Sequence, residues 1–101
     1  MEKIYIYGIY NPKNPKNIRY VGKTKKNVEE RLKQHIYLSK KKVKRPLYLW
    51  INKLLENNIN PEIMIIEETD SERWIEREIF WISEYKKIKS YLIYLMVVNL
   101  I

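Results

Sequence analysis

The sequence contains no cysteine and only one histidine. The missing cysteines exclude disulfides, thiolate nucleophiles and cysteine-ligated zinc sites. A single histidine argues against a metal site built from several imidazoles. A metal bound by this chain would therefore be held mainly by oxygen atoms, and Mg²⁺ or Mn²⁺ fits such ligands best.

The patterns of a membrane segment and of a signal peptide are also missing. No apolar run approaches the roughly 18 residues that a spanning helix needs. The N-terminal segment lacks the charged, apolar and small-residue regions of a secretory signal. We therefore expect an intracellular protein, cytoplasmic or nuclear, with no membrane partner.

Length and charge narrow the class further. The 101 residues are the size of one domain with a modest core, and a hydrophobic content of 46% predicts a folded chain. Lysine and arginine number 20 against 12 acidic residues, which gives a net charge of +8 and a pI near 9.6. This balance favours a polyanionic partner such as nucleic acid. Charge alone does not distinguish DNA from RNA or from a membrane surface.

The N-terminal third predicts a β-hairpin followed by a helix. Residues 4–10 are β-branched and aromatic, residues 11–17 form a polar connection with two prolines, and residues 18–22 form the second strand. The expected hairpin covers about 3–22. Asn27, with a glutamate three residues later, has the spacing of a capping box, and we expect a helix over about 27–39.

The rest of the chain predicts two more helices and one strand. Apolar residues recur at helical spacing after Pro46, which indicates a stripe that faces the core. A short apolar run after Pro61 predicts a central strand buried on both faces. Thr69 and Glu72 have capping-box spacing and predict the start of a third helix. The elements expected are a helix over about 46–56 with the stripe Leu47, Trp50, Ile51, Leu54 and Leu55, a strand over about 62–67, a helix over about 70–87, and a C-terminal segment, 90–101, packed on the sheet.

Glu78 occupies a position of the third predicted helix where the stripe should be apolar. It lies four residues after Trp74 and four before Ile82. Burying a lone carboxylate costs several kcal/mol. We therefore expect Glu78 to have either a metal or a cationic partner, and a structural salt bridge is the simpler of the two explanations.

Basic residues of the first predicted helix can share one site. Arg31 and His35 are one turn apart beside the apolar stripe, although either could be an ordinary surface or boundary residue. A basic run follows, which is either a solvated loop or a phosphate-contacting one. The nucleic-acid-binding candidates in this run are Lys40, Lys41, Lys42, Lys44 and Arg45.

Taken in order, these pieces resemble the GIY-YIG endonuclease family, which includes homing endonucleases, over essentially the whole chain. The resemblance implies one nuclease domain over 1–101, of the α/β (α+β) class, with a small, mostly antiparallel three-stranded sheet flanked by about three helices. It also implies a metal-dependent DNA endonuclease that nicks one strand per active site, using a tyrosine-activated water and one divalent cation, Mg²⁺ or Mn²⁺. The pieces are Gly8-Ile9-Tyr10, Tyr20-Val21-Gly22-Lys23-Thr24, Arg31, His35, Glu78 and Asn99.

The resemblance also assigns roles to residues. Glu78 would be the metal ligand, Lys23 would lower the pKa of the catalytic tyrosine, and Gly22 would let the chain turn tightly between strand and helix. Gly8-Ile9-Tyr10 matches the family name, but it stands directly before Asn11-Pro12, where the strand ends. Tyr7 is therefore favoured as the catalytic tyrosine, with Tyr10 as the alternative. The catalytic residues implied are Tyr7, Tyr20, Lys23, Arg31, His35 and Asn99.

Departures from the family pattern leave other readings open. Asn99 lacks the polar, glycine-containing tail that normally follows it, so the protein either ends early or is one domain of a longer chain. We expect a monomer or weak dimer that binds DNA and needs no nucleotide or organic cofactor. The alternatives to a nuclease are a catalytically inactive nucleic-acid-binding module of the same fold and an interaction domain whose basicity is incidental.

Overall fold

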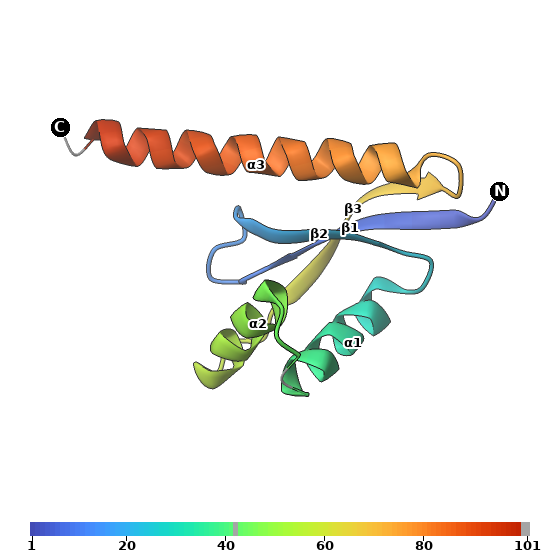
Figure 1. Ribbon diagram of the computed structural model, residues 1–101, viewed down its shortest axis with the longest axis horizontal. Coiled ribbons are helices and arrows are strands. Elements are labelled where there is room, and N and C mark those ends of the chain that lie inside the picture. Colours follow the sequence, from blue (N-terminus) through green and yellow to red (C-terminus); the bar gives the residue numbers. More distant parts are fainter. Residues whose placement is uncertain (42, 100–101) are drawn as a thin grey trace.

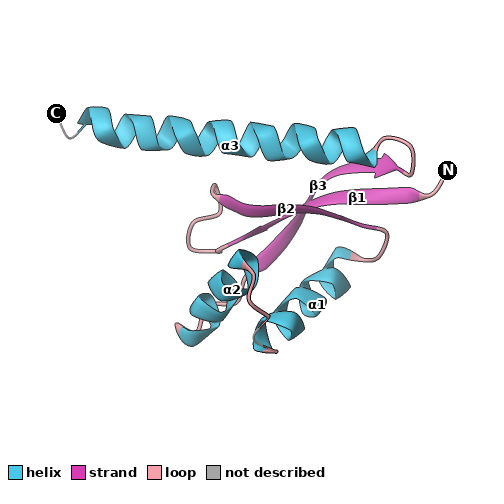
Figure 2. Cartoon of the chain, viewed as in Figure 1, coloured by secondary structure: helices cyan, strands magenta, loops and turns pink. Residues whose placement is uncertain are grey.

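The computed structural model describes the backbone of residues 1–41 and 43–99 and the side chains as far as Ile88. Its elements, in chain order, are β1 (Lys3–Tyr10), β2 (Ile18–Thr24), α1 (Val28–Lys40), α2 (Pro46–Glu56), β3 (Glu62–Asp70) and α3 (Trp74–Asn99). Figure 1 and Figure 2 show the sheet between two helical layers, with α3 on one face and α1 and α2 on the other. Within the described residues, an antiparallel three-stranded sheet and three helices confirm the expected α+β class.

Strands β1 and β2 form an antiparallel hairpin whose connection starts at Asn11. Its Oδ1 atom accepts a hydrogen bond from the backbone N–H of Lys13 at 2.9 Å, and its backbone oxygen accepts one from the N–H of Asn14 at 2.8 Å. Asparagine favours such turns because its side chain can bond the backbone two residues further on. In the resulting register Tyr7 lies opposite Gly22.

The strand order is β2-β1-β3, so β1 is the central strand. This corrects the expectation that the apolar strand after Pro61 is central: β3 lies at the edge, and Met64 and Ile65 are 39% and 49% exposed. The expectation was wrong because a short apolar run reports hydrophobicity and not the number of neighbouring strands.

Alternate residues of β1 face opposite helical layers. Tyr7 and Ile9 pack with Leu32 of α1 in a buried cluster. Ile4 and Ile6 face the layer of α3 and are 1% and 0% exposed. The central strand thus supplies both halves of the core, and it delivers Tyr7 to the side of the sheet that α1 covers.

Both short helices begin at the residues that favour helix starts. The Oδ1 atom of Asn27 accepts a hydrogen bond from the N–H of Glu29 at 2.8 Å and caps α1, while Pro46 occupies the first turn of α2. The buried stripe of α2 is rotated from the expected one. Its buried residues are Tyr48, Ile51 and Leu54.

The cap of α3 differs from the expected one. The Oδ1 atom of Asp70 accepts hydrogen bonds from the N–H groups of Glu72 at 2.9 Å and Arg73 at 3.0 Å, and the helix begins at Trp74. The expected capping box at Thr69 is therefore wrong. Thr69 is still part of β3 and pairs with β1, so the chain leaves the strand one residue later.

A bidentate ion pair attaches α3 to β3. The Nε and Nη2 atoms of Arg77 both donate to the Glu67 carboxylate at 2.7 Å, and the Nε1 atom of Trp81 donates to it at 3.1 Å. The planar guanidinium matches a carboxylate in this geometry. These bonds fix the position of the first turns of α3 above the sheet.

Helix α3 continues without a break to Asn99, and its C-terminal part extends past the end of the sheet (Figure 1). The segment 90–101 was expected to pack on the sheet. Its backbone as far as Asn99 instead continues α3, and its side chains lie outside the described residues. In the parts of the chain that are described, no helix has the length and apolarity to span a bilayer.

Gly22 lies inside β2 and not in a turn between strand and helix. None of the described glycines has a positive φ, so the expected conformational role is wrong. A Cβ atom at this position would lie 2.6 Å from the hydroxyl oxygen and 2.7 Å from the Cζ atom of Tyr7, and 2.8 Å from the Cε1 atom of Tyr20. The residue is glycine because two tyrosine rings occupy the space of a side chain.

The two glycines of the chain allow a matched test of this packing. At Gly8 an added Cβ would lie 2.8 Å from one methyl group, Cγ2 of the half-buried Ile18, whereas at Gly22 it would lie 2.6–2.8 Å from atoms of two aromatic side chains. We expect Gly22→Ala to lower the free energy of unfolding by about 1–3 kcal/mol, the usual cost of overpacking, and Gly8→Ala to lower it less. Urea unfolding measures both values. Equal values for the two variants would contradict the close approach at Gly22.

Candidate active site

A buried hydrogen bond joins Tyr7 of β1 to His35 of α1. The Tyr7 hydroxyl oxygen lies 2.7 Å from Nε2 of His35, and the two residues are 0% and 1% exposed. On the opposite side of the ring, Nδ1 lies 3.3 Å from the hydroxyl oxygen of Tyr48, which belongs to α2. The imidazole therefore lies between two tyrosine hydroxyls. Together with Tyr20, these residues are called the tyrosine–histidine cluster below.

Burial sets the protonation of this pair. Burial, and then the positive charge of Arg31, lowers the pKa of His35 to about 4, so the imidazole is neutral at pH 7. Burial also raises the pKa of the Tyr7 hydroxyl well above its ordinary value, and Tyr20 adds to the increase. Hydrogen bonding and charge from Arg31 oppose it. The cation that favours ionisation of Tyr7 is thus Arg31.

Within the tyrosine–histidine cluster, Tyr20 is the residue that the charge of α3 reaches. Its ring centroid lies 6.1 Å from that of Tyr7 and 5.6 Å from that of His35, and the planes of the Tyr20 and His35 rings are inclined by 69°. Burial raises the pKa of Tyr20, the charge of Arg31 lowers it, and the charge of Glu78 raises it. The Tyr20 hydroxyl therefore lies within electrostatic range of both a cation on α1 and a carboxylate on α3.

Glu78 is a half-buried carboxylate on α3. Burial raises its pKa and the charge of Lys23 opposes the increase. Among the side chains that the structure describes, none forms an ion pair with Glu78. The salt bridge that was the simpler explanation of this carboxylate is therefore not observed in that part of the chain.

The oxygen donor of Glu78 fits a divalent ion that needs few protein ligands. The described residues contain no group of three or more His, Cys, Asp and Glu residues that could enclose a metal. Mg²⁺ commonly takes one or two carboxylates and fills its other positions with water and substrate phosphate. A single carboxylate at the edge of a site is compatible with such binding.

Lys23 lies on the other face of the sheet from Tyr7. It pairs with Ile6 of β1, whose side chain faces α3, and its Nζ atom lies 4.6 Å from the ring centroid of Trp74. The expectation that Lys23 lowers the pKa of Tyr7 is therefore corrected. Residues that follow one another in a strand point to opposite faces, and Lys23 follows Gly22, the partner of Tyr7.

The structure brings Tyr7 and not Tyr10 into the tyrosine–histidine cluster. The Tyr10 hydroxyl donates a hydrogen bond to Oε2 of Glu62 at 3.0 Å, on the surface and away from His35. The two tyrosines differ because they are an odd number of residues apart on one strand and face opposite sides.

Asn99 and the basic run lie apart from this cluster. Asn99 ends α3, and 21 residues of α-helix separate it from Glu78 by about 32 Å. Its side chain is outside the described residues, as is Lys42. Lys40, at the far end of α1, lies about 14 Å along the helix axis from Arg31. The described members of the basic run are exposed: Lys40, Lys41, Lys44 and Arg45.

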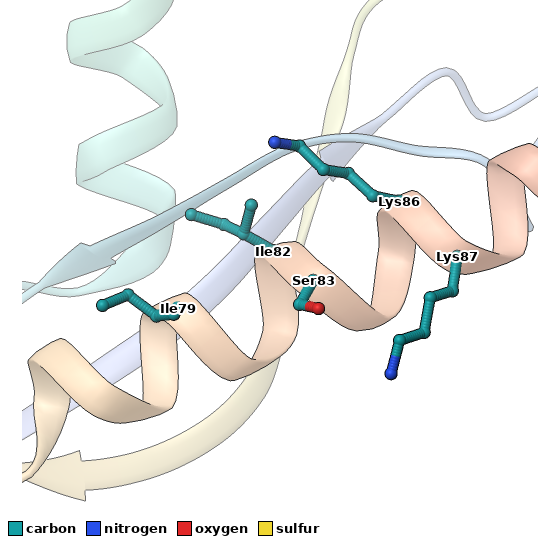
Figure 3. A pocket seen from close by; sticks show the side chains of 5 residues that line it. All are labelled: Ile79, Ile82, Ser83, Lys86 and Lys87. Atoms are coloured by element: carbon teal, nitrogen blue, oxygen red, sulfur yellow. The ribbon is translucent and has the colours of Figure 1, made fainter.

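Several basic residues beside the site were not singled out from the sequence. Lys25 and Lys26 line a shallow hollow with Lys23 and Arg31. The position of Lys25 and Lys26 directly after Tyr20-Val21-Gly22-Lys23-Thr24 could have indicated that they lie beside the site. Arg19 and Lys86 line a second hollow together with Tyr20 and Ile82. Figure 3 shows Ile82 and Lys86 on the side of α3 that faces the sheet, with Lys87 pointing the other way.

Comparison with known families identifies the domain. The family model of the GIY-YIG catalytic domain matches residues 3–91. The chain belongs to the GIY-YIG family. The resemblance noted in the sequence is thereby confirmed, and GIY-YIG domains are nuclease domains. The matched range includes Tyr7, Tyr20, Arg31, His35 and Glu78. Searches of curated proteins and of solved structures give no match.

His35 of this GIY-YIG domain should titrate at low pH. It is the one histidine of the chain, so its ¹H and ¹⁵N signals need no assignment among several rings. We expect a midpoint near pH 4, below the ordinary 6.5, because burial favours the neutral imidazole. A midpoint near 6.5 would show that the ring is solvated.

The same pKa shift predicts a loss of stability in acid. Between pH 6.5 and about 4 the unfolded chain binds a proton at His35 that the folded chain does not bind, so the free energy of unfolding falls as the pH falls. Urea unfolding of the wild type and of His35→Gln at several pH values isolates this contribution. The variant should have the shallower pH dependence in this window.

Proposed function

We propose that this GIY-YIG domain is a metal-dependent endonuclease that hydrolyses phosphodiester bonds of DNA and nicks one strand per active site. The observation that carries the proposal is the half-buried Glu78 carboxylate, which has no ion-pair partner among the described residues. Its charge raises the pKa of Tyr20, and Tyr20 lies next to the buried Tyr7–His35 pair. Phosphodiester hydrolysis needs a base for water, a cation for the phosphoryl oxygens and help for the leaving oxygen.

Tyr7 is the residue proposed to take the proton of the attacking water. Its hydroxyl oxygen lies 2.7 Å from Nε2 of His35, which is proposed to accept the hydroxyl proton. As the Tyr7 oxygen accepts a proton from water, its own proton can pass to Nε2, which is available because His35 is neutral at pH 7. No free phenolate has to accumulate in this transfer, so the raised pKa of Tyr7 is compatible with the role.

Arg31 supplies the permanent charge. Its Nη1 atom donates to Oε1 of Gln34 at 2.9 Å, which leaves other N–H groups of the guanidinium for a ligand. A planar guanidinium matches the nonbridging oxygens of a phosphate and stabilises the charge that grows on them. Tyr20, within range of both Arg31 and Glu78, is proposed to orient water or phosphate between them.

Glu78 would hold the divalent cation, Mg²⁺ or Mn²⁺. When bound, such an ion acts as a Lewis acid toward the phosphate and the leaving oxygen. The chain's own contribution is the carboxylate: burial raises the pKa of Glu78, and the positive charge of Lys23 acts in the opposite direction. Lys23 is thus proposed to support Glu78 and not Tyr7.

The two basic hollows described above are proposed to contact the DNA backbone. One contains Lys23, Lys26 and Arg31, and the other contains Arg19 and Lys86. Lysine and arginine bind phosphates without reading base sequence, and their contribution falls as salt rises. Contact between the basic run after α1 and DNA remains a prediction. The intracellular location is also still a prediction. A monomer with one such site cuts one strand, and cutting both strands takes a second binding event or a weak dimer.

Removing the carboxylate tests the reaction. We expect the wild type to nick supercoiled plasmid in Mg²⁺ or Mn²⁺ and to stop in EDTA. Glu78→Ala should lower the nicking rate by about 10²–10³-fold, the usual cost of losing one stabilising group at a reacting centre. Glu76→Ala, which removes an exposed carboxylate from the same helix, is the matched control and should keep the wild-type rate.

One observation favours an inactive nucleic-acid-binding module as the second candidate. Burial raises the pKa of Tyr7, so almost none of its hydroxyl is in the phenolate form that could act as a base at pH 7. This candidate predicts plasmid binding without nicking in any metal, and the same affinity for wild type and Glu78→Ala. An interaction domain with incidental basicity would bind weakly, and about 200 mM salt would abolish the binding with no effect of Mg²⁺.

Two tyrosines on opposite faces of β1 provide a second test of the reaction. Tyr7→Phe keeps the ring and removes the hydroxyl that faces His35, so we expect nicking to fall by about 10²–10⁴-fold, the range for general bases. Tyr10→Phe removes the hydroxyl that bonds Glu62 at the surface and should leave the rate within about twofold of the wild type. The reverse order of effects would transfer the role to Tyr10.

A further inference from the structure

Tyr48 has a buried hydroxyl that packing alone does not explain. It shares the buried stripe of α2 with Ile51 and Leu54, where an apolar residue would be sufficient, and it is 6% exposed. A buried hydroxyl without a hydrogen bond is costly. The partner that the structure provides is Nδ1 of His35 at 3.3 Å, with the ring centroids 5.8 Å apart.

A hydrogen bond between the two helices keeps Tyr48 beside His35. The Nδ2 atom of Asn52, one turn further along α2, donates to the backbone oxygen of Ser39 in α1 at 2.7 Å. Ser39 is one turn after His35 and is 0% exposed. The tyrosine and the imidazole are therefore held at a fixed position by a contact that involves neither of them.

The neutral imidazole of His35 has one donor nitrogen and one acceptor nitrogen, and its two neighbours decide which is which. In one arrangement Tyr7 donates to Nε2 and the Nδ1–H group donates to Tyr48. In the other, Tyr48 donates to Nδ1 and the Nε2–H group donates to Tyr7. Only in the first does Nε2 have a free lone pair for the Tyr7 proton, so only the first lets the Tyr7 oxygen accept a proton from water while it passes its own proton to the imidazole.

The distances favour the first arrangement. A separation of 2.7 Å between Tyr7 and Nε2 is ordinary for a hydroxyl donor and short for an N–H donor. The 3.3 Å between Nδ1 and Tyr48 is too long for a hydroxyl donor and closer to the range of an N–H donor. Both values point to a proton on Nδ1.

We propose that Tyr48 is a positioning residue that accepts a hydrogen bond from Nδ1–H of His35 and so fixes the tautomer and orientation of the ring toward Tyr7. Without Tyr48, Nδ1–H would be a buried donor without an acceptor. The proton would then move to Nε2, and the Nε2–H group would donate a hydrogen bond to the Tyr7 oxygen. The consequence for catalysis rests on the proposed function, whereas the tautomer does not.

Nitrogen NMR of the imidazole decides the proposal directly. The ¹⁵N shifts of the single histidine distinguish the Nδ1–H from the Nε2–H tautomer at pH 7. We expect Nδ1–H in the wild type and in the control Tyr37→Phe, which removes the hydroxyl of a tyrosine on α1 that is 59% exposed. We expect Nε2–H, or a mixture of the two tautomers, in Tyr48→Phe. An Nε2–H wild type, or an unchanged Nδ1–H tautomer in Tyr48→Phe, would overturn the proposal.

Two further measurements separate positioning from general stability. Tyr7→Phe removes the partner of Nε2 and keeps Tyr48, so His35 should stay in the Nδ1–H tautomer. A change to Nε2–H in this variant would show that Tyr7, and not Tyr48, determines the tautomer. In plasmid nicking, Tyr48→Phe should be slower by about tenfold, as for other groups that orient a functional histidine, with a wild-type circular dichroism spectrum. If the wild type does not nick at all, the proposed function fails while the NMR result still decides the role of Tyr48. The wild-type spectrum tests the direction of the hydrogen bonds even if Tyr48→Phe does not fold.

Discussion

The ring of Tyr7 occupies the space that a side chain at position 22 would fill, and the rest of the site depends on this contact. Because Gly22 has no Cβ, the Tyr7 hydroxyl can reach His35 from the central strand, with the Tyr20 ring close to both. The cross-strand pairing of Tyr7 with Gly22 fixes the position of the hydroxyl along the sheet, and α1 fixes the position of the imidazole. A shift of one residue in this register would send the tyrosine to the face that α3 covers.

Burial and charge act against each other throughout the site. Removing water raises the pKa of the Tyr7 hydroxyl and of the Glu78 carboxylate and lowers the pKa of His35, so burial alone favours the neutral form of every group. Arg31 opposes burial at Tyr7, and Lys23 opposes it at Glu78. The two cations therefore act on different groups of the site, Arg31 on Tyr7 and Lys23 on Glu78.

Much of the fold and part of the site follow from local rules. Asn27 caps its helix, and Arg31 lies one turn from His35, because capping and helical spacing act over a few residues. The role of Gly22 could not be predicted because it depends on the strand register. The place of Tyr48 beside His35 could not be predicted because it depends on the packing of α2 against α1. Lys23 was misplaced for a related reason: adjacency in a strand puts neighbours on opposite faces. The edge position of β3 was missed because an apolar run contains no information on strand order.

The two halves of the site come from opposite ends of the described chain. The tyrosine–histidine cluster is complete once α2 has formed, whereas Glu78 arrives with α3, which attaches to the other face of the sheet through Glu67 and Arg77. Ribosomal synthesis proceeds from the N-terminus, so a nascent or truncated chain that ends before α3 contains the aromatic residues without the carboxylate. The complete set of groups therefore exists only after the last helix has left the ribosome and docked on the sheet.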